Sequence, residues 1–317
     1  MIELRKDYLL DRWVIISEIR SQRPRQFAEL KSESISTCFF CPGNESLTPD
    51  EKYSVKDELG RWRIRVFENK YPAVSLDCGR NDCSAKIKTA DDYFTYADAL
   101  GVHEIIVETN DHNKQLWDLS RDELSEVFRV YNNRITTLSS INGIKYVSVF
   151  KNSGKDAGTS IVHSHSQIIA TMFIPPLIRE KLKAIKERNF CPYCEILNIE
   201  RKSLRRCFEN DSFVAFTPYA SRFHYEIWVM PKEHINSMSL FTEKHYSDLS
   251  EIMLMILARL KSINAPYNFF LHYNEDKDFH FMIEVTPRLA TWAGYEESTG
   301  IIINSVSPES AAGFYRG

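Results

Sequence analysis

Two Cys-x-x-Cys pairs stand at equivalent places in the two halves of the chain. The first pair is Cys38 and Cys41, and the second is Cys191 and Cys194. In both halves the pair is followed by apolar strand-like runs, a histidine next to an acidic residue, a helix-like run and a second histidine. Self-similarity of this kind is typical of a duplicated unit. We therefore expect two halves with one fold, at residues 1–174 and 175–317.

The repeat also predicts two metal sites. Two thiols closed by a two-residue turn bind zinc when two imidazoles complete a tetrahedron. The predicted ligand sets are Cys38, Cys41, His112 and His163 in the first half, and Cys191, Cys194, His234 and His280 in the second. Because side chains occupy all four positions of each set, we expect two structural zinc sites with no open position for water.

The hydrophobic pattern predicts an α+β fold. Short apolar and β-branched runs predict strands at residues 13–16, 62–67, 104–108 and 144–150. Ser120 and Glu123 fit a capping box that starts a helix reaching Leu138, and a second helix is predicted at 242–260. Each half should hold an antiparallel sheet with packed helices, and the charged segment 175–190 should connect the halves.

Charge and composition exclude several classes of partner. The chain has 317 residues, a formal net charge of −3 and a pI near 6.3, so it carries no electrostatic footprint for nucleic acid or an anionic membrane. No segment approaches the roughly 18 apolar residues of a membrane span. Seven cysteines, an odd number, are not a disulfide framework. We expect a cytoplasmic protein without a nucleic-acid or membrane partner.

The segment from His163 to Gln167 combines two imidazoles and an amide between apolar runs. On an extended segment, alternate side chains face the same way, so His163, His165 and Gln167 should share one face. If His163 binds the metal, His165 is held on a rigid, anchored strand. A neutral imidazole can attack phosphorus and form a covalent intermediate that passes the group onward. This predicts His165 as the nucleophile of a two-step nucleotidyl transfer.

The identity of residue 167 indicates the class of leaving group. Glutamine cannot act as an acid, so it cannot protonate a poor leaving group such as an amine or an alcohol. Its amide can donate to a phosphoryl oxygen as charge shifts in the transition state. Gln167 therefore suits a leaving group that is itself a phosphate. In the second half Met282 takes the place of His165, so only the first half should be catalytic.

These motifs resemble a known family. The run from Phe150 to Ala170, with its His-Ser-His-Ser-Gln, is similar to the galactose-1-phosphate uridylyltransferase branch of the histidine-triad superfamily. The resemblance extends over nearly the whole chain, through segments 5–7, 20–24, 67–71, 111–112 and 294–296. It implies a ping-pong nucleotidyltransferase, acting on a nucleotide sugar and a sugar phosphate, in which His165 carries the nucleotide monophosphate.

The resemblance also implies roles for individual residues. Around the α-phosphate it places Asn152, Ser160 and Gln167, and in the nucleoside pocket Asn69 and Tyr71. It implies that Arg20 and Arg23 contact phosphates from the neighbouring subunit of a homodimer, and that Tyr295 and Glu296 approach the sugar.

The sequence departs from the family in two places. Bacterial members have His-Pro-His-Gly-Gln where this chain has His-Ser-His-Ser-Gln, and Ile302 falls near the place of a glutamine that meets the hexose phosphate. The serines and the 296–300 segment also look like the ADP-glucose phosphorylase branch, which passes an adenylyl group to inorganic phosphate. Galactose-1-phosphate uridylyltransferase comes first, and ADP-glucose phosphorylase is the alternative. A non-catalytic zinc-containing nucleotide-binding module is the rival from another class.

Overall fold

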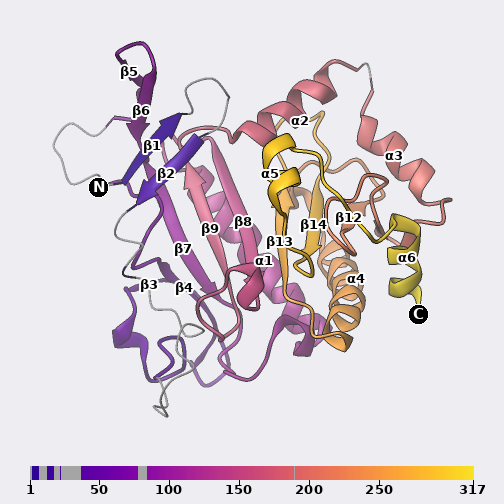
Figure 1. Cartoon of the computed structure of the whole chain (residues 1–317). Helices are drawn as coiled ribbons and strands as arrows, with labels where there is room; N and C mark the ends of the chain where they lie inside the picture. Colours follow the sequence, from indigo (N-terminus) through magenta and orange to yellow (C-terminus); the bar gives the residue numbers. More distant parts are fainter. Residues whose placement is uncertain (1, 7–12, 18–21, 23–36, 78–83, 189) are drawn as a thin grey trace. The chain divides into compact units, whose positions relative to one another are not determined.

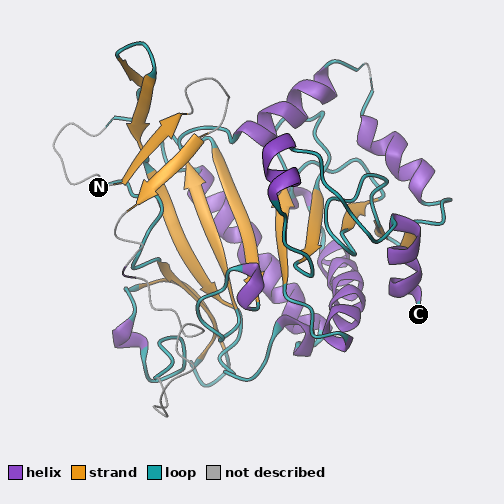
Figure 2. Cartoon of the chain, viewed as in Figure 1, coloured by secondary structure: helices purple, strands orange, loops and turns teal. Residues whose placement is uncertain are grey.

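The computed structural model describes residues 2–6, 13–17, 22, 37–77, 84–188 and 190–317, and it forms a mixed α+β fold (Figures 1 and 2). The strands are β1 (Ile2–Lys6), β2 (Trp13–Ser17), β3 (Glu51–Lys56), β4 (Trp62–Glu68), β5 (Lys88–Ala90), β6 (Phe94–Asp98), β7 (Gly101–Val107), β8 (Tyr146–Ser153), β9 (His165–Thr171), β10 (Arg206–Glu209), β11 (Phe213–Phe216), β12 (Ile227–Pro231), β13 (Tyr267–His272) and β14 (Met282–Pro287). The α-helices are α1 (Arg121–Ser139), α2 (Pro176–Lys186), α3 (Pro192–Glu200), α4 (Glu243–Ser262), α5 (Gly294–Thr299) and α6 (Pro308–Arg316).

The chain divides into two compact units whose segments interleave. The first holds residues 1–113, 133–149 and 160–181, and the second holds 114–132, 150–159 and 182–317. The division between residues 174 and 175, which the sequence repeat indicates, stays a prediction. In the described part of the chain, no helix combines the length and the apolar character that a membrane crossing requires.

The first unit contains two groups of strands. A small sheet has the order β2-β1-β6-β5, and the strands that carry the site follow the order β3-β4-β7-β9-β8 (Figure 1). Strands β7 and β9 pair antiparallel, with His165 opposite Val107 and Gln167 opposite Ile105. This register places His165 at the end of the pair, opposite the last residue of β7, and Gln167 two residues further along β9.

Side chains of β7 alternate between two faces of the sheet. Glu104 accepts two hydrogen bonds from the Arg134 guanidinium, at 2.9 and 2.8 Å, and both side chains are buried. This ion pair joins β7 to the last turns of α1. Its charges are compensated inside the core, because each carboxylate oxygen has its own N–H donor.

The second unit follows the order β8-β13-β14-β12-β11-β10, with β8 divided between the two units. Its two long helical segments are tied together by polar contacts. On α1, Ser125 donates its hydroxyl to Ser250 of α4 at 2.9 Å, and Arg121 lies 3.2 Å from the Asp248 carboxylate. The Ser125–Ser250 hydrogen bond gives these two buried hydroxyls a partner where the helix faces meet.

Local sequence signals set the helix ends as predicted. The backbone N–H of Ser120 donates to the Glu123 carboxylate at 2.7 Å, and the N–H of Glu123 donates to the Ser120 hydroxyl, which confirms the capping box. Helix α4 begins after Thr242, which is also its cap. The predicted connector at 175–190 contains helix α2, and the strand expected at 144–150 runs from Tyr146 to Ser153.

Candidate active site and metal centres

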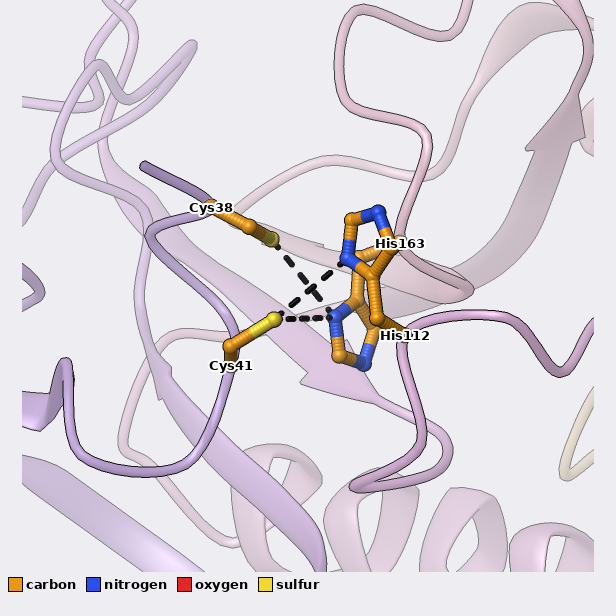
Figure 3. Close-up of side chains that lie close together, drawn as sticks. All are labelled: Cys38, Cys41, His112 and His163. Carbon is orange, nitrogen blue, oxygen red and sulfur yellow. Dashed lines mark hydrogen bonds between the residues drawn. The ribbon is translucent and has the colours of Figure 1, made fainter. Parts of the chain in front are cut away.

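The first Cys-x-x-Cys pair meets two histidines from distant segments (Figure 3). Cys38 and Cys41 form a tight turn in which the Cys41 N–H donates to the Cys38 carbonyl. His112 follows β7, and His163 lies two residues before the first residue of β9. The Nδ1 atom of His163 lies 3.6 Å from each sulfur, and that of His112 lies 3.4 Å from the Cys41 sulfur.

These distances fit a four-coordinate metal ion. Ligands about 2.2 Å from a tetrahedral ion lie about 3.6 Å from one another. The Nε2–H of His163 donates to the Thr109 carbonyl at 2.7 Å, so Nδ1 turns its lone pair toward the thiols. Burial lowers the pKa of His163, which keeps the ring neutral. Burial and the Cys38 thiol raise the pKa of Cys41 to about 11, so a pair of thiolates here requires a cation.

The second Cys-x-x-Cys pair forms a matching cluster in the second unit. The Cys194 sulfur lies 3.2 Å from Nδ1 of His234 and 3.4 Å from Nδ1 of His280, and the Cys191 sulfur lies 4.0 Å from His280. Both imidazoles again donate Nε2–H to a backbone carbonyl. Burial lowers the pKa of His280 to about 4. The donor set could hold a metal ion as in the first unit, although His234 is exposed to solvent.

His165 is the first residue of β9 and its side chain is buried. Its Nδ1–H donates to the carbonyl of His163 at 2.8 Å, because a carbonyl can only accept. The lone pair of the ring is therefore on Nε2. The Phe40 ring packs against the imidazole in a T-shaped arrangement, at a centroid distance of 5.3 Å. The two histidines thus keep their lone pairs on different nitrogens. His163 directs Nδ1 toward the thiols, whereas His165 has its lone pair on Nε2.

The two serines of the motif lie on the other face of the segment and share one acceptor. Ser164 donates its hydroxyl to Glu108 Oε2 at 2.6 Å, and Ser166 donates to Oε1 of the same carboxylate. All three side chains are buried. The N–H of Glu108 also donates to the Ser164 carbonyl. Glu108 therefore holds both residues that flank His165, a role that sequence reasoning missed.

A cavity that is open to solvent adjoins His165 in the first unit. Its lining includes four more of the predicted site residues: Asn69, Tyr71, Ser160 and Gln167. Aromatic and aliphatic side chains, among them Phe39, Leu47 and Phe67, supply much of the remaining wall. A mainly apolar cavity with a few polar groups in its lining is typical of a small-molecule site.

The other predicted contacts are not among the described residues that line this cavity. Asn152 belongs to the second unit, where its Oδ1 accepts from Asn268 at 2.8 Å. Tyr295 and Glu296 are on the exposed helix α5, and the Glu296 carboxylate accepts from the Ala293 N–H, so it caps that helix. Arg20 and Arg23 lie outside the described residues. The roles of all five stay predictions.

The position equivalent to His165 in the second unit has no nucleophile. Met282 begins β14 as His165 begins β9, and it is fully buried against Val214, Phe216 and Met230. A thioether among apolar side chains has a packing role. The two units therefore have the same kind of Cys₂His₂ ligand set. The position two residues after the last ligand is a histidine, His165, in the first unit and a methionine, Met282, in the second.

Comparison with known proteins adds a family. The model for "Galactose-1-phosphate uridyl transferase, N-terminal domain" matches residues 2–175. An ADP-glucose phosphorylase of Arabidopsis thaliana is 31% identical over 98% of this chain and 91% of its own length. A galactose-1-phosphate uridylyltransferase of Thermotoga maritima is 30% identical over 98% of this chain and 97% of its own. The crystal structure of an Arabidopsis thaliana ADP-glucose phosphorylase with bound ADP-glucose matches with a TM-score of 0.77 and 30% identity, and it covers 100% of this chain and 99% of that one.

Proposed function

The chain belongs to the galactose-1-phosphate uridylyltransferase family, and we propose that it is a hexose-1-phosphate nucleotidyltransferase. The reaction we propose first is the exchange between UDP-glucose and galactose 1-phosphate. The observation that carries the proposal is the His165 imidazole, whose Nδ1–H is held by a backbone carbonyl and whose ring lines a cavity suited to a nucleotide.

The reaction takes place in two displacements at one phosphorus. In the first, Nε2 of His165 attacks the α-phosphorus of the nucleotide sugar, and the bond to the bridging oxygen breaks. Glucose 1-phosphate leaves with the electron pair of that bond. In the second, a phosphate oxygen of the acceptor attacks the same phosphorus and the P–N bond breaks, which restores the neutral imidazole. Nδ1–H donates to the His163 carbonyl throughout, so the ring keeps its orientation.

Two polar residues of the cavity suit the charge that develops on the phosphoryl oxygens. Ser160 and Gln167 both line the cavity beside His165. A hydroxyl and an amide N–H there would donate to the non-bridging oxygens as the transition state forms. No general acid is required, because the leaving group is a phosphate of low basicity.

We propose zinc for both Cys₂His₂ clusters. Two thiolates and two neutral imidazoles are a common zinc ligand set, and the distances fit a closed tetrahedron. Bound zinc would fix the segment that carries His163 and thereby the start of β9. It would take no part in the displacement, since protein ligands fill its four positions.

ADP-glucose phosphorylase activity is the second candidate, in which inorganic phosphate replaces the sugar phosphate as acceptor. Two observations favour it: the 31% identity to the Arabidopsis enzyme of that name, and the similarity to a structure that holds ADP-glucose. The first step would be the same, with an adenylyl group on His165. Both candidates therefore depend on one nucleophile and differ in the base and the acceptor.

Turnover of the two substrate pairs tests both candidates. Purified protein is incubated with UDP-glucose and galactose 1-phosphate, or with ADP-glucose and phosphate, and nucleotide products are separated by chromatography. We expect turnover of one pair by the wild type and none by His165→Ala. Turnover by the variant at the wild-type rate would reject His165 as nucleophile, and binding without turnover of either pair would favour the non-catalytic module.

We further propose a cytoplasmic homodimer in which Arg20 and Arg23 contact phosphates in the site of the neighbouring subunit. The support for this is the family to which the chain belongs. Mixing inactive His165→Ala with an inactive double variant of the two arginines should restore turnover if the site is shared between subunits.

A further inference from the structure

His103 is a buried histidine beside the proposed active site that the reaction does not itself use. It lies on β7, where its neighbour across the sheet is Ile169 of β9. Three groups approach its ring nitrogens. The backbone N–H of Ala73 lies 3.0 Å from Nδ1, while Gln167 Oε1 lies 3.0 Å and Asn69 Nδ2 lies 3.1 Å from Nε2.

The backbone contact determines which ring nitrogen of His103 carries the proton. The Ala73 N–H can only donate, so Nδ1 of a neutral His103 must accept. The proton is then on Nε2. Asn69 cannot accept it, because its Oδ1 accepts from the Tyr71 N–H and the atom it places near Nε2 is its Nδ2, an amide donor. The 3.1 Å approach of Asn69 Nδ2 to a protonated Nε2 is therefore a contact between two donors and not a hydrogen bond. The acceptor for the Nε2–H is therefore Gln167 Oε1.

This hydrogen bond fixes the direction of the Gln167 carboxamide. A glutamine amide can rotate so that oxygen and nitrogen exchange places, at little cost when nothing distinguishes them. Here the oxygen is held by His103, and the nitrogen is left as the donor end of a side chain that lines the cavity. The opposite orientation would turn a carbonyl oxygen toward the anionic phosphoryl group and would replace the Gln167 acceptor of the His103 Nε2–H with another donor.

We propose that His103 is a positioning residue that orients the Gln167 amide as a donor to the phosphoryl group. This proposal rests on the proposed function of the same site. The hydrogen bonds run from the backbone of Ala73 through both ring nitrogens of His103 to Gln167. The Gln167 amide N–H that they orient acts most strongly in the transition state, when negative charge develops on the phosphoryl oxygens. Its loss should therefore slow nucleotidylation of His165 more than it weakens binding of the nucleotide sugar.

A matched pair of variants separates the two ring nitrogens. In His103→Gln the new amide can put an N–H near the place of Nε2, within reach of Gln167. In His103→Asn the shorter amide can accept from Ala73 near the place of Nδ1, but it does not reach Gln167. A merely structural role for His103 would make the two variants equally defective, whereas the positioning role makes Asn the worse substitute.

The experiment measures the single-turnover rate of His165 nucleotidylation with α-³²P-labelled nucleotide sugar. We expect His103→Asn to lower this rate about 10- to 100-fold, with the Kd of the nucleotide sugar changed much less, and His103→Gln to recover most of the loss. In the Gln167→Ala background, His103→Asn should have no further effect, because the amide that it orients is gone. Thermal unfolding of each variant checks that it is folded.

The outcomes separate this proposal from the proposed function. No label on the wild type would reject the nucleotidyltransferase itself. A labelled wild type with His103→Asn equally fast would overturn the role of His103. Equal losses in the Asn and Gln variants, or losses that multiply between His103→Asn and Gln167→Ala, would also overturn it.

Discussion

At the scale of single residues, the two histidines of the motif differ in which ring nitrogen carries the proton. His163 donates Nε2–H to a carbonyl and offers Nδ1 to the thiols, whereas His165 donates Nδ1–H and keeps the Nε2 lone pair. The strand alternation in the sequence predicts that His165 and Gln167 share a face, and both line one cavity. The predicted extended stripe is shorter than expected, because β9 begins at His165 and His163 precedes it.

The sequence gives little indication of the residues elsewhere in the chain that form hydrogen bonds to the 163–167 segment. Glu108 and His103 lie more than 50 positions before their partners, and only the antiparallel register of β7 and β9 brings them together. A repeat can reveal ligand sets because both copies show the same residues. A contact made in one copy alone has no second copy to reveal it.

Loss of Glu108 should destabilise the segment that carries the nucleophile. Glu108→Ala leaves two buried serine hydroxyls without their acceptor, which should lower the free energy of unfolding by about 2–4 kcal/mol. Glu108→Gln keeps one carbonyl acceptor and should lose less. Urea unfolding followed by circular dichroism measures both, and a loss below about 1 kcal/mol for the alanine variant would contradict the account.

The buried His280 predicts how stability of the metal-free protein depends on pH. Its pKa is lowered by burial from 6.5 to about 4, so the unfolded chain binds a proton at this residue at higher pH than the folded chain. The free energy of unfolding should therefore fall as pH falls below 6.5, by about 2 kcal/mol at pH 5 from this group. Chelator-treated wild type and His280→Asn are compared by urea unfolding. Equal pH dependence in both would contradict this prediction.

At the scale of elements, capping and hydrophobic period predict the helices well, and tertiary pairing determines the rest. Helices α1 and α4 lie within one or two residues of their predicted ends, because their caps and apolar faces are local signals. The sequence does not predict that β1, β2, β5 and β6 form one small sheet. Strand β1 pairs with β6 across a long stretch of the chain, and no local pattern indicates which strand pairs with which. The ion pair between Glu104 and Arg134 is likewise a tertiary feature.

Breaking the Glu104–Arg134 pair should be costly, and replacing both partners should not. Arg134→Met leaves a buried, unpaired carboxylate and should lower the free energy of unfolding by about 3–5 kcal/mol. The double variant with Glu104→Leu removes that charge and should recover most of the loss. Urea unfolding of the two variants decides, and a double variant that is less stable than Arg134→Met alone would contradict a charge-based cause.

At the scale of the whole molecule, the described residues hold the Cys₂His₂ ligand set twice, and the imidazole two residues after the last ligand occurs only with the first set. His165 and Met282 begin equivalent strands, yet Met282 is enclosed by apolar side chains. The sequence repeat predicts this difference directly. The acceptor cannot be predicted in the same way, because the two residues that the family resemblance assigns to the sugar, Tyr295 and Glu296, lie on the exposed helix α5.

The two metal centres should differ in how fast a chelator removes their ions. In the first cluster no ligand is exposed, whereas His234 of the second is. We expect about two zinc ions per chain by elemental analysis, one released rapidly to a chromogenic chelator and one slowly. His234→Ala should abolish the rapid phase and leave the slow one. A single phase from the wild type would contradict the difference between the sites.

The central claim is that His165 carries the nucleotide between two displacements. Its most direct test is isolation of that intermediate: the protein is mixed with α-³²P-labelled UDP-glucose or ADP-glucose without acceptor, denatured in alkali and digested, and the labelled peptide is sequenced. The account predicts label on the peptide that holds His165, released when acceptor is added before denaturation, and no label on His165→Ala. A variant that is labelled as the wild type is, or a wild-type label on any other residue, would contradict it.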